Sequence, residues 1–271
     1  MQSMDNEAED QDNGADAGSG NRFGPIAASP AYKLVADAIE RQIVSGRVRP
    51  GEAIGTEADL VKQFGVNRST VREGIRLLEQ GGLIRRDSSR RLYASVPRYD
   101  RLATRISRAF VLHEVTFREL WEATMAIESA VVELAADRIS EEGLGELDLN
   151  LRKSRAATDK PSELAILDIE FHTILCKAAG NRVLQLAREP ENKLFFPTTE
   201  MLFQKNPQAA RRNVDAHGAI VAALHRRDKA DALLWMKRHV NDWKKGFELI
   251  GKSIDEPIDR VYAQHVLESN L

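Results

Sequence analysis

Apolar residues recur at helical spacing along most of this chain, and glycine, proline and polar breaks separate the apolar stripes. In the first third, the pattern predicts a helix over residues 32–45, a turn at 49–51 and two short helices within 56–82. A β-hairpin is expected over residues 83–93, bounded by two glycines and a proline. Three helices followed by a hairpin predict a winged helix-turn-helix.

The two short helices carry their own start and stop signals. Thr56 followed by Asp59 fits a reciprocal capping pattern, and Gly65 can end the first helix because glycine adopts the left-handed conformation without steric cost. Asn67 can cap the second helix through its side-chain oxygen. The sequence therefore predicts a tight turn between the helices, which is typical of a helix-turn-helix.

The second short helix separates apolar and basic residues onto different faces. Val71, Ile75 and Leu78 recur at i, i+4 and i+7, a spacing that faces a core. Arg68 and Arg72 are four residues apart, so they share another face near the helix start. Two arginines on a helix are often only a solvated surface. The spacing by itself therefore leaves DNA binding open.

The hairpin carries two pairs of basic residues on either side of its turn. They are Arg85, Arg86, Arg90 and Arg91. Four arginines on one hairpin are hard to place in a core, and they suit a wing that contacts phosphates or the minor groove. Helix and hairpin together favour binding to double-stranded DNA over the solvated-surface interpretation.

Beyond residues 97–100 nearly every segment has helical spacing, and no strand is expected. Helices are predicted over about 100–113, 117–139, 141–157, 162–179, 181–204, 208–227 and 229–250. The helix at 117–139 is apolar on a broad face, which is typical of a central helix in a bundle. The expected fold is mainly α: an N-terminal winged helix-turn-helix followed by an all-α helical bundle.

Charge is unevenly distributed, although the chain as a whole has a formal net charge of −2. Residues 1–30 hold six acidic residues and one arginine, a net charge of −5. Residues 31–98 hold thirteen Lys and Arg against eight Asp and Glu, a net charge of +5. The acidic segment has few large apolar side chains and is expected to be disordered. The basic segment suits a partner with phosphates.

These patterns predict five segments. They are an acidic disordered tail at 1–29, the winged helix-turn-helix at 30–96, a linker at 97–104, the helical domain at 105–252, and a C-terminal tail at 253–271 with a short helix over 259–267.

Cysteine content and hydropathy point to a cytoplasmic protein without a membrane partner. The one cysteine, Cys176, excludes an intrachain disulfide, and its apolar helical run favours a small buried side chain over a nucleophile. The acidic N-terminus has no signal peptide, and no apolar run approaches the ~20 residues that span a bilayer.

Four residues of the helical half have the spacing and chemistry of metal ligands. Asp168 and His172 are four apart on one predicted helix, and His217 and His239 lie on two later helices beside apolar residues. One carboxylate and three imidazoles suit Zn²⁺ foremost, and also Ni²⁺, Mn²⁺ or Fe²⁺. Each histidine taken alone is more often an ordinary buried or surface side chain. Such a metal could be structural, catalytic or part of a ligand pocket.

Taken together, these features resemble the GntR family of bacterial transcription regulators over residues 31–250. The resemblance rests on an ordered set of positions from the turn to the wing: Arg49-Pro50-Gly51, Glu57, Leu60, Phe64 to Glu73, Leu77-Leu78-Glu79 and Gly82-Leu83-Ile84. The helical half resembles the ligand-sensing FCD domain of the FadR-like subfamily. The metal-binding branch of that domain carries an Asp-x-x-x-His and two later histidines, and all four positions match here.

The resemblance implies a homodimer that binds a short operator with dyad symmetry and is usually a repressor. Arg68 and Arg72 would contact bases or phosphates, and Asn67, Ser69 and Thr70 would be available to phosphates. A small effector, usually an organic acid, would bind at the metal and change DNA binding. The resemblance implies no enzymatic activity.

The chain departs from the family pattern at three places. Ala58 stands where a basic residue often follows the glutamate of the second helix, and Ser89 and Arg91 occupy the places expected for the wing glycines. Thr124 falls where many relatives have an arginine that pairs with the carboxylate of the effector. Either another cation supplies that charge, or the effector is less acidic.

Two alternatives remain at the level of sequence. In one, the bundle of a DNA-binding dimer only dimerises and its metal is structural. In the other, the chain is a metal-dependent enzyme, with Glu170 or Glu200 as a base by residue type alone.

Overall fold

The computed structural model describes residues 29–97 and 99–258 of the 271-residue chain. The tail predicted at 1–29, except its last residue, and the short helix predicted at 259–267 lie outside the described residues. The chain divides into two compact units between Val96 and Pro97. No described helix is long and apolar enough to cross a membrane.

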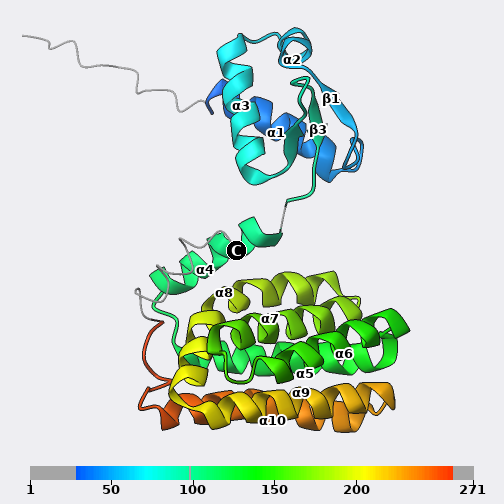
Figure 1. The fold of residues 1–271 in the computed structure, drawn as a ribbon. Helices are drawn as coiled ribbons and strands as arrows, with labels where there is room; N and C mark the ends of the chain where they lie inside the picture. Colours follow the sequence, from blue (N-terminus) through cyan, green and yellow to red (C-terminus); the bar gives the residue numbers. More distant parts are fainter. Residues whose placement is uncertain (1–28, 98, 259–271) are drawn as a thin grey trace, which may run out of the picture. The chain divides into compact units, whose positions relative to one another are not determined.

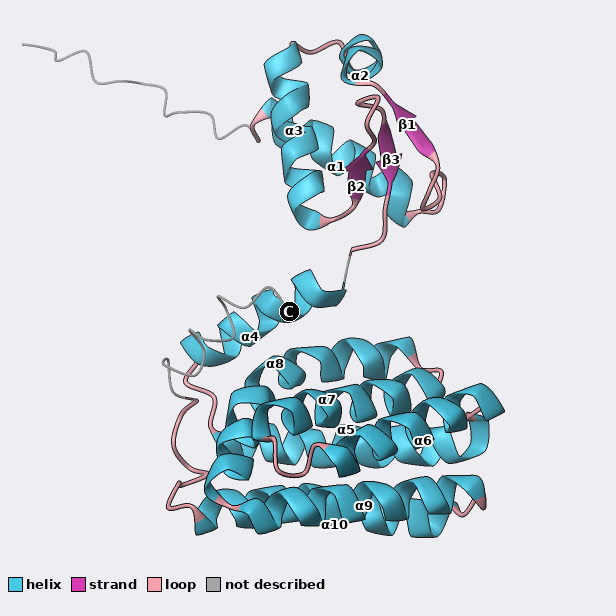
Figure 2. Ribbon diagram, viewed as in Figure 1, coloured by secondary structure: helices cyan, strands magenta, loops and turns pink. Residues whose placement is uncertain are grey.

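The first unit is a winged helix-turn-helix, as predicted (Figure 2). Its elements are α1 (Ala31–Val44), β1 (Ala53–Gly55), α2 (Glu57–Phe64), α3 (Arg68–Gly81), β2 (Ile84–Arg86) and β3 (Leu92–Ala94). The sheet is antiparallel in the order β1-β3-β2, so the predicted hairpin gains a third strand. Three residues are too short to show the alternation that marks a strand, and sequence pattern therefore missed β1.

The capping residues of the helix pair act as their types predicted. The side chain of Thr56 accepts from Asp59 N–H while Asp59 accepts from Thr56 N–H, closing the reciprocal cap of α2. Gly65 ends α2 at φ 65°, and Asn67 Oδ1 accepts from Thr70 N–H at 2.8 Å to start α3. Val71 and its partners in the predicted stripe are buried against α1 and the sheet. The turn geometry is thus set locally, and the core then holds α3 in place.

The wing turns through Arg90, and not through Ser89 or Arg91, the two places expected for the wing glycines. Arg90 has φ 66°, whereas Ser89 and Arg91 are not in the left-handed region. Arg90 N–H donates to Asp87 O and Asp87 N–H donates to Arg91 O, each at 3.0 Å, so the turn ends with one left-handed residue. Asp87 Oδ1 also accepts from Arg91 N–H at 2.9 Å. These bonds hold a non-glycine residue in a conformation that side chains disfavour.

The described residues of the second unit form seven helices, which run from green to orange in Figure 1. They are α4 (Tyr99–Leu112), α5 (Phe117–Arg138), α6 (Glu141–Ala156), α7 (Pro161–Ala178), α8 (Arg182–Lys205), α9 (Pro207–His225) and α10 (Lys229–Leu249). Each lies within a few residues of its predicted bounds. Among the described residues the only strand-like pairing in this unit is an isolated bridge between Thr116 and Pro257.

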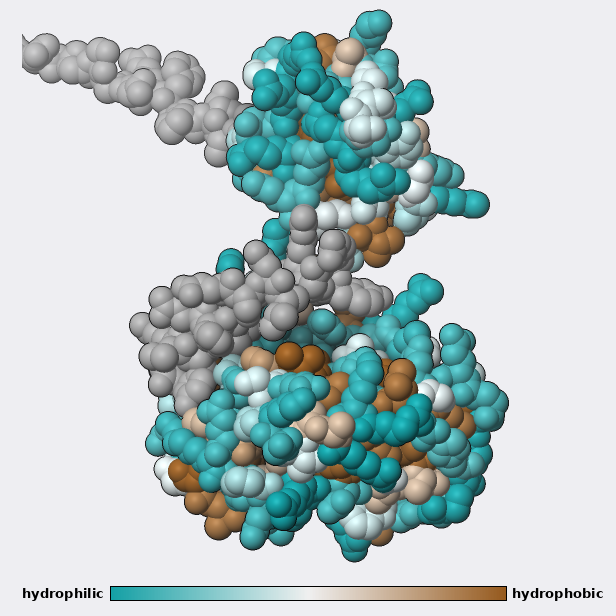
Figure 3. Space-filling view, viewed as in Figure 1, coloured by the Kyte–Doolittle hydropathy of each residue, from teal (hydrophilic) through white to brown (hydrophobic). Residues whose placement is uncertain are grey.

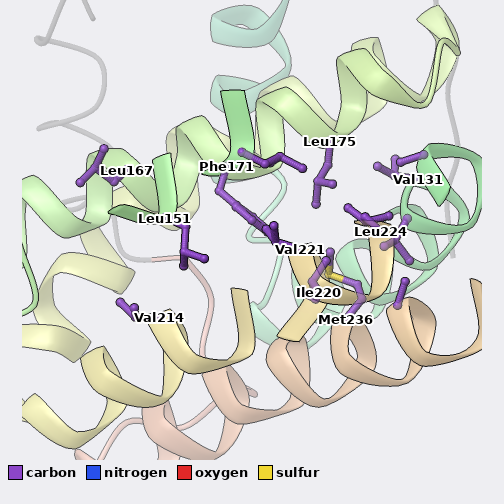
Figure 4. Packing of buried hydrophobic residues seen from close by; sticks show 14 of the residues in the cluster. Val131, Leu151, Leu167, Phe171, Leu175, Val214, Ile220, Val221, Leu224 and Met236 are labelled. Carbon is purple, nitrogen blue, oxygen red and sulfur yellow. The ribbon is translucent and has the colours of Figure 1, made fainter. Parts of the chain in front are cut away.

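The core of the bundle lies between α7 and the α9–α10 pair, with α5 completing it. Figure 4 shows Phe171 and Leu175 of α7 above Val221, Leu224 and Met236. Of these, all but Val221 are less than 2% exposed. A core packed this densely holds the inward-facing polar residues of the same helices in fixed positions.

The residues after α10 return to the start of α5. Ile254 and Ile258 are buried in a second apolar cluster with Phe117 and Phe247. Arg118 N–H donates to Ile254 O at 2.7 Å, and Ile258 N–H donates to Val115 O at 2.9 Å. The described part of the C-terminal segment is therefore packed onto the bundle.

Cys176 is buried on α7 with a free thiol. Burial raises the pKa of this thiol to about 12. The thiolate is therefore disfavoured at neutral pH, which agrees with the prediction of a small buried side chain.

Candidate metal centre and DNA-binding face

The bundle brings the four predicted ligand residues together. Asp168 and His172 come from adjacent turns of α7, His217 from α9 and His239 from α10. Each offers one ligand atom, and these four atoms all lie within 4.8 Å of one another. The three imidazoles are buried, and Asp168 is partly exposed. Helical spacing aligned the first pair, but only the packing of three helices gathers all four.

Short distances between ligand atoms mark this cluster. Nε2 of His172 and Nε2 of His239 face each other at 3.1 Å, and Nε2 of His217 lies 3.4 Å from Oδ1 of Asp168. Neither ring nitrogen of His217 makes a hydrogen bond with the described residues. The His217 ring also stacks on Phe171, with ring centroids 3.7 Å apart. The His217 ring is thus fixed by packing while its nitrogens remain available.

Two histidines of the cluster, His217 and His239, are held in the neutral form. Burial, together with the charge of His172, lowers the pKa of His239 to about 4. Burial and the two other histidines lower the pKa of His217 well below its usual value. Neutral imidazole is the form that binds a metal, so these rings are ready to do so at neutral pH.

A buried ion pair behind His172 was not predicted from the sequence. Oε1 of Glu128 lies 2.9 Å from Nδ1 of His172 and accepts a 2.5 Å hydrogen bond from Nε of Arg188. Burial alone would raise the pKa of Glu128, but the charges of His172 and Arg188 outweigh it and lower that pKa to about 2. An ionised carboxylate on Nδ1 orients the ring so that Nε2 faces the cluster.

Further buried polar residues surround the ion pair. Thr124 donates from Oγ1 to Oε2 of Glu191 at 2.9 Å, and Arg188 also donates to Oδ1 of Asn192. Burial raises the pKa of Glu191 to about 7, against the opposing effects of Arg188 and the Thr124 hydroxyl. A sequence signal was present for Glu128, since it lies on the apolar face of α5, where an unpaired charge is costly.

A pocket opens beside the cluster. Its cavity volume is about 50 Å³, which is space for a few water-sized groups. Three of the four candidate ligands line it, and His217 does not. The rest of its lining includes Thr124, Arg188, Asn213, Phe195, Phe203 and Trp243. Asn213 donates to Oδ1 of Asp168 at 2.7 Å and so holds that carboxylate.

The two glutamates considered as bases lie away from this pocket. Glu170 accepts from Nδ2 of Asn150 at 3.1 Å, and Glu200 accepts from the hydroxyl of Ser162. Neither lines the pocket. Their hydrogen bonds join neighbouring helices of the bundle.

The first unit presents a broad concave surface between α3 and the wing. Its lining includes Arg68, Ser69, Arg72, Arg76, Arg86 and Arg90. Asn67, at the start of α3, is exposed and Thr70 is half-buried. The view of this unit in Figure 3 shows a mainly hydrophilic face. The arginines at the start of α3 and those of the wing thus line the same concave surface.

Arg86 is held differently from the other wing arginines. Its Nη1 donates to Oε1 of Glu57 at 2.9 Å and its Nε donates to Oε1 of Glu79 at 3.2 Å. Glu57 also lies 3.6 Å from Nε of Arg68. Glu57 therefore ties the wing and the start of α3 to α2. Arg85 has its guanidinium carbon 4.9 Å from the ring centre of Tyr93, and Arg90 and Arg91 are exposed.

Both units match known families. Residues 31–93 match the gntR family of bacterial regulatory proteins, and residues 119–242 match the FCD domain. The chain belongs to the GntR family. This FCD-containing GntR protein is a DNA-binding transcription regulator that responds to a ligand.

Individual relatives agree with the assignment. The "HTH-type transcriptional repressor NanR" of Cronobacter sakazakii is 25% identical over 254 residues, which are 89% of this chain and 94% of that protein. The NanR of Salmonella typhimurium is 24% identical over 263 residues, 93% of this chain and 97% of that protein. The solved structure of Streptococcus agalactiae GntR has the same fold, with a TM-score of 0.56 at 21% identity. The matched region covers 79% of this chain and 99% of the chain in that structure.

Proposed function

We propose that this GntR-family regulator is a cytoplasmic, homodimeric repressor whose FCD domain holds a divalent metal and senses a small organic acid at that metal. Asp168, His172, His217 and His239 are the proposed ligands. The observation that carries the proposal is the convergence of their ligand atoms from three helices, beside a pocket that three of the four residues line.

The spacing of the ligand atoms fits a metal. With bonds of about 2.1 Å, two ligands of one metal lie about 3.0 Å apart in octahedral geometry and about 3.4 Å apart in tetrahedral geometry. The two distances of 3.1 Å and 3.4 Å within this cluster agree with those separations.

The donor set favours Zn²⁺, with Ni²⁺, Mn²⁺ and Fe²⁺ as the other candidates, since three imidazoles and one carboxylate suit each of them. When bound, the metal would supply a positively charged site for an oxygen of the effector. The residues of this chain do the rest: Glu128 orients His172, and Asn213 holds Asp168 in place.

For DNA binding, we propose contacts from the start of α3 and from the wing. Arg68 and Arg72 are the proposed base or phosphate contacts on α3, and Asn67, Ser69 and Thr70 the proposed phosphate contacts. Arg85, Arg86, Arg90 and Arg91 of the wing would contact the phosphates or the minor groove. Arg86 would also hold the wing in position through its ion pairs with Glu57 and Glu79. Two copies would meet an operator with dyad symmetry.

A physical link runs from the pocket towards the start of the second unit. Ser107 on α4 is buried, and its hydroxyl donates to Pro190 O on α8 at 2.8 Å. Pro190 lies two residues after Arg188, which lines the pocket. We propose that a change in α8 on effector binding moves α4, the helix that directly follows the DNA-binding unit in the chain. Binding at the pocket would then alter operator affinity.

Sensing is favoured over a purely structural metal because three of the candidate ligands line an open pocket. The enzyme alternative is less supported. The two glutamates considered as bases do not line that pocket, and the relatives named above are transcriptional repressors.

The DNA-binding part of the proposal is tested with the full chain and a random-sequence duplex at about 50 mM and about 200 mM salt. We expect binding at the lower concentration, a steep loss at the higher one, and weaker binding by the R68A/R72A variant. K229A, a change in the bundle, serves as the matched control. Absence of binding at about 50 mM salt would overturn the proposal.

The sensing part is tested with His172→Ala. We expect this variant to lose metal and ligand response while it still binds DNA as a folded dimer. If its dimer dissociates, the metal is structural.

A further inference from the structure

The pocket beside the metal cluster contains a permanently charged cation. Among the described residues that line it, Arg188 is the only lysine or arginine. Thr124 lines the same pocket, but it is uncharged and donates its hydroxyl to Glu191. Any negative charge on a ligand of this pocket, away from the metal, would therefore be balanced at Arg188.

The guanidinium of Arg188 is fixed but not saturated. Its Nε donates to Glu128 and its Nη1 donates to Asn192, whereas its Nη2 has no hydrogen-bond partner among the described residues. The side chain is 6% exposed, and its guanidinium carbon lies 6.0 Å from the ring centre of Phe195. A buried arginine with one nitrogen left for a ligand is a rigid, pre-oriented donor.

The surrounding charges leave room for one anion. Glu128 pairs with Arg188 and Asp242 pairs with Arg212, whereas a metal would bring two further positive charges, of which Asp168 would offset one. Burial raises the pKa of Glu191 and so disfavours its charged form. Such a site has a deficit of negative charge, which an anionic ligand would remove.

The rest of the wall sets the shape of the ligand. Phe195, Leu202, Phe203 and Trp243 form an apolar side, and the Nε1 of Trp243 is buried without a hydrogen-bond partner among the described residues. A ligand that fits all of these features has a short hydrocarbon body, a charged oxygen group and a second oxygen.

We propose that Arg188 is the carboxylate anchor of the effector, which binds between this guanidinium and the metal cluster. The inference rests on the proposed sensing function and names the residue that selects for negative charge. Arg188 lies on α8 and Thr124 on α5, so the charge comes from a different helix than the one on which the family resemblance placed it.

The test uses the metal-loaded full chain and three simple carboxylates, acetate, succinate and citrate, each compared with its uncharged amide. Binding is followed by titration calorimetry and by the shift in melting temperature. We expect at least one acid to bind in the millimolar range or better and its amide to bind more weakly. Arg188→Gln should lower the affinity for that acid by about ten- to a hundredfold, while the affinity for the amide changes little.

A second variant separates recognition from folding, because R188Q leaves the buried Glu128 without its guanidinium partner. The double variant E128Q/R188Q removes both charges and keeps two hydrogen-bonding side chains of similar size. We expect it to fold and to retain metal, yet to bind the acid as weakly as R188Q. Arg226→Gln, which alters an arginine just after α9 that pairs with Asp231, is the matched arginine control and should bind the acid like the unaltered protein.

Three outcomes would overturn the assignment. They are normal acid binding by R188Q, restored acid binding by the folded double variant, or no preference of the unaltered protein for any acid over its amide. None of these outcomes bears on binding to DNA, so the regulator proposal would fail separately, in the duplex experiment.

Discussion

Arg188 and Glu128 form a 2.5 Å hydrogen bond between two helices, α8 and α5, and both side chains are almost completely buried. The same carboxylate oxygen of Glu128 lies 2.9 Å from Nδ1 of His172. One buried oxygen therefore joins the candidate metal centre to the one arginine among the described residues that line its pocket.

The first prediction concerns the stability of this pair. Arg188→Ala leaves an ionised Glu128 in the core without its guanidinium partner, so we expect a loss of about 3–5 kcal/mol in the free energy of unfolding. E128Q/R188Q removes both charges of the pair and should lose much less. Urea unfolding of metal-free protein measures both. Equal losses in the two variants would show that the charges themselves contribute little.

The second prediction concerns metal removal. A metal that binds only the folded chain stabilises it by about 2.7 kcal/mol when its free concentration is 100 times the dissociation constant. We therefore expect a chelator to lower the melting temperature of the unaltered protein, and to have no effect on H217A or H239A. His225→Ala, which alters an exposed histidine paired with Asp148, should behave like the unaltered protein. A melting temperature that does not respond to Zn²⁺ or chelator would contradict the metal site.

The third prediction concerns pH and Glu191, a carboxyl that faces Thr124, Arg188 and the charge of Glu128. In the unfolded chain its pKa is near 4.5, and burial raises the folded value to about 7. Between these values the folded chain holds the proton and the unfolded chain does not, so stability falls as pH rises from about 4.5 to about 7. The contribution is at most about 3 kcal/mol.

Glu191→Gln should remove this fall in stability. The measurement is the difference in melting temperature between the two metal-free proteins as a function of pH. We expect E191Q to gain relative stability as pH rises to about 7 and the difference then to level off. A difference that stays constant from pH 5 to pH 8 would show that Glu191 titrates normally.

The fourth prediction concerns the wing. Arg90 adopts φ 66°, a conformation that costs a non-glycine residue about 1–2 kcal/mol. Arg90→Gly relieves this cost but makes the unfolded chain more flexible, so we expect a gain in stability of no more than about 1 kcal/mol. If Arg90 contacts a phosphate, the same variant binds DNA more weakly. The slope of the logarithm of the binding constant against the logarithm of salt concentration is then smaller in magnitude by about 1. Unchanged DNA affinity would remove Arg90 from the proposed interface.

Much of the fold could be predicted from the sequence because its signals are local. Thr56, Asp59 and Asn67 each satisfy a backbone group within three residues, and apolar spacing along each helix selects its buried face. The strand β1 was missed because it is stabilised by pairing with β3, about forty positions later in the chain. The conformation of Arg90 likewise depends on the hydrogen bonds of Asp87 across the turn.

The sequence by itself determined the order of the helices, the helix-turn-helix with its basic wing, and the four residues with the chemistry of metal ligands. Only the tertiary structure decided which polar residues accompany those four. Glu128, Arg188 and Asn213 lie on three different helices, and their spacing in the chain says nothing of their distance in space. They meet because the apolar faces of the helices pack in one arrangement, which then forces each buried charge to find a partner.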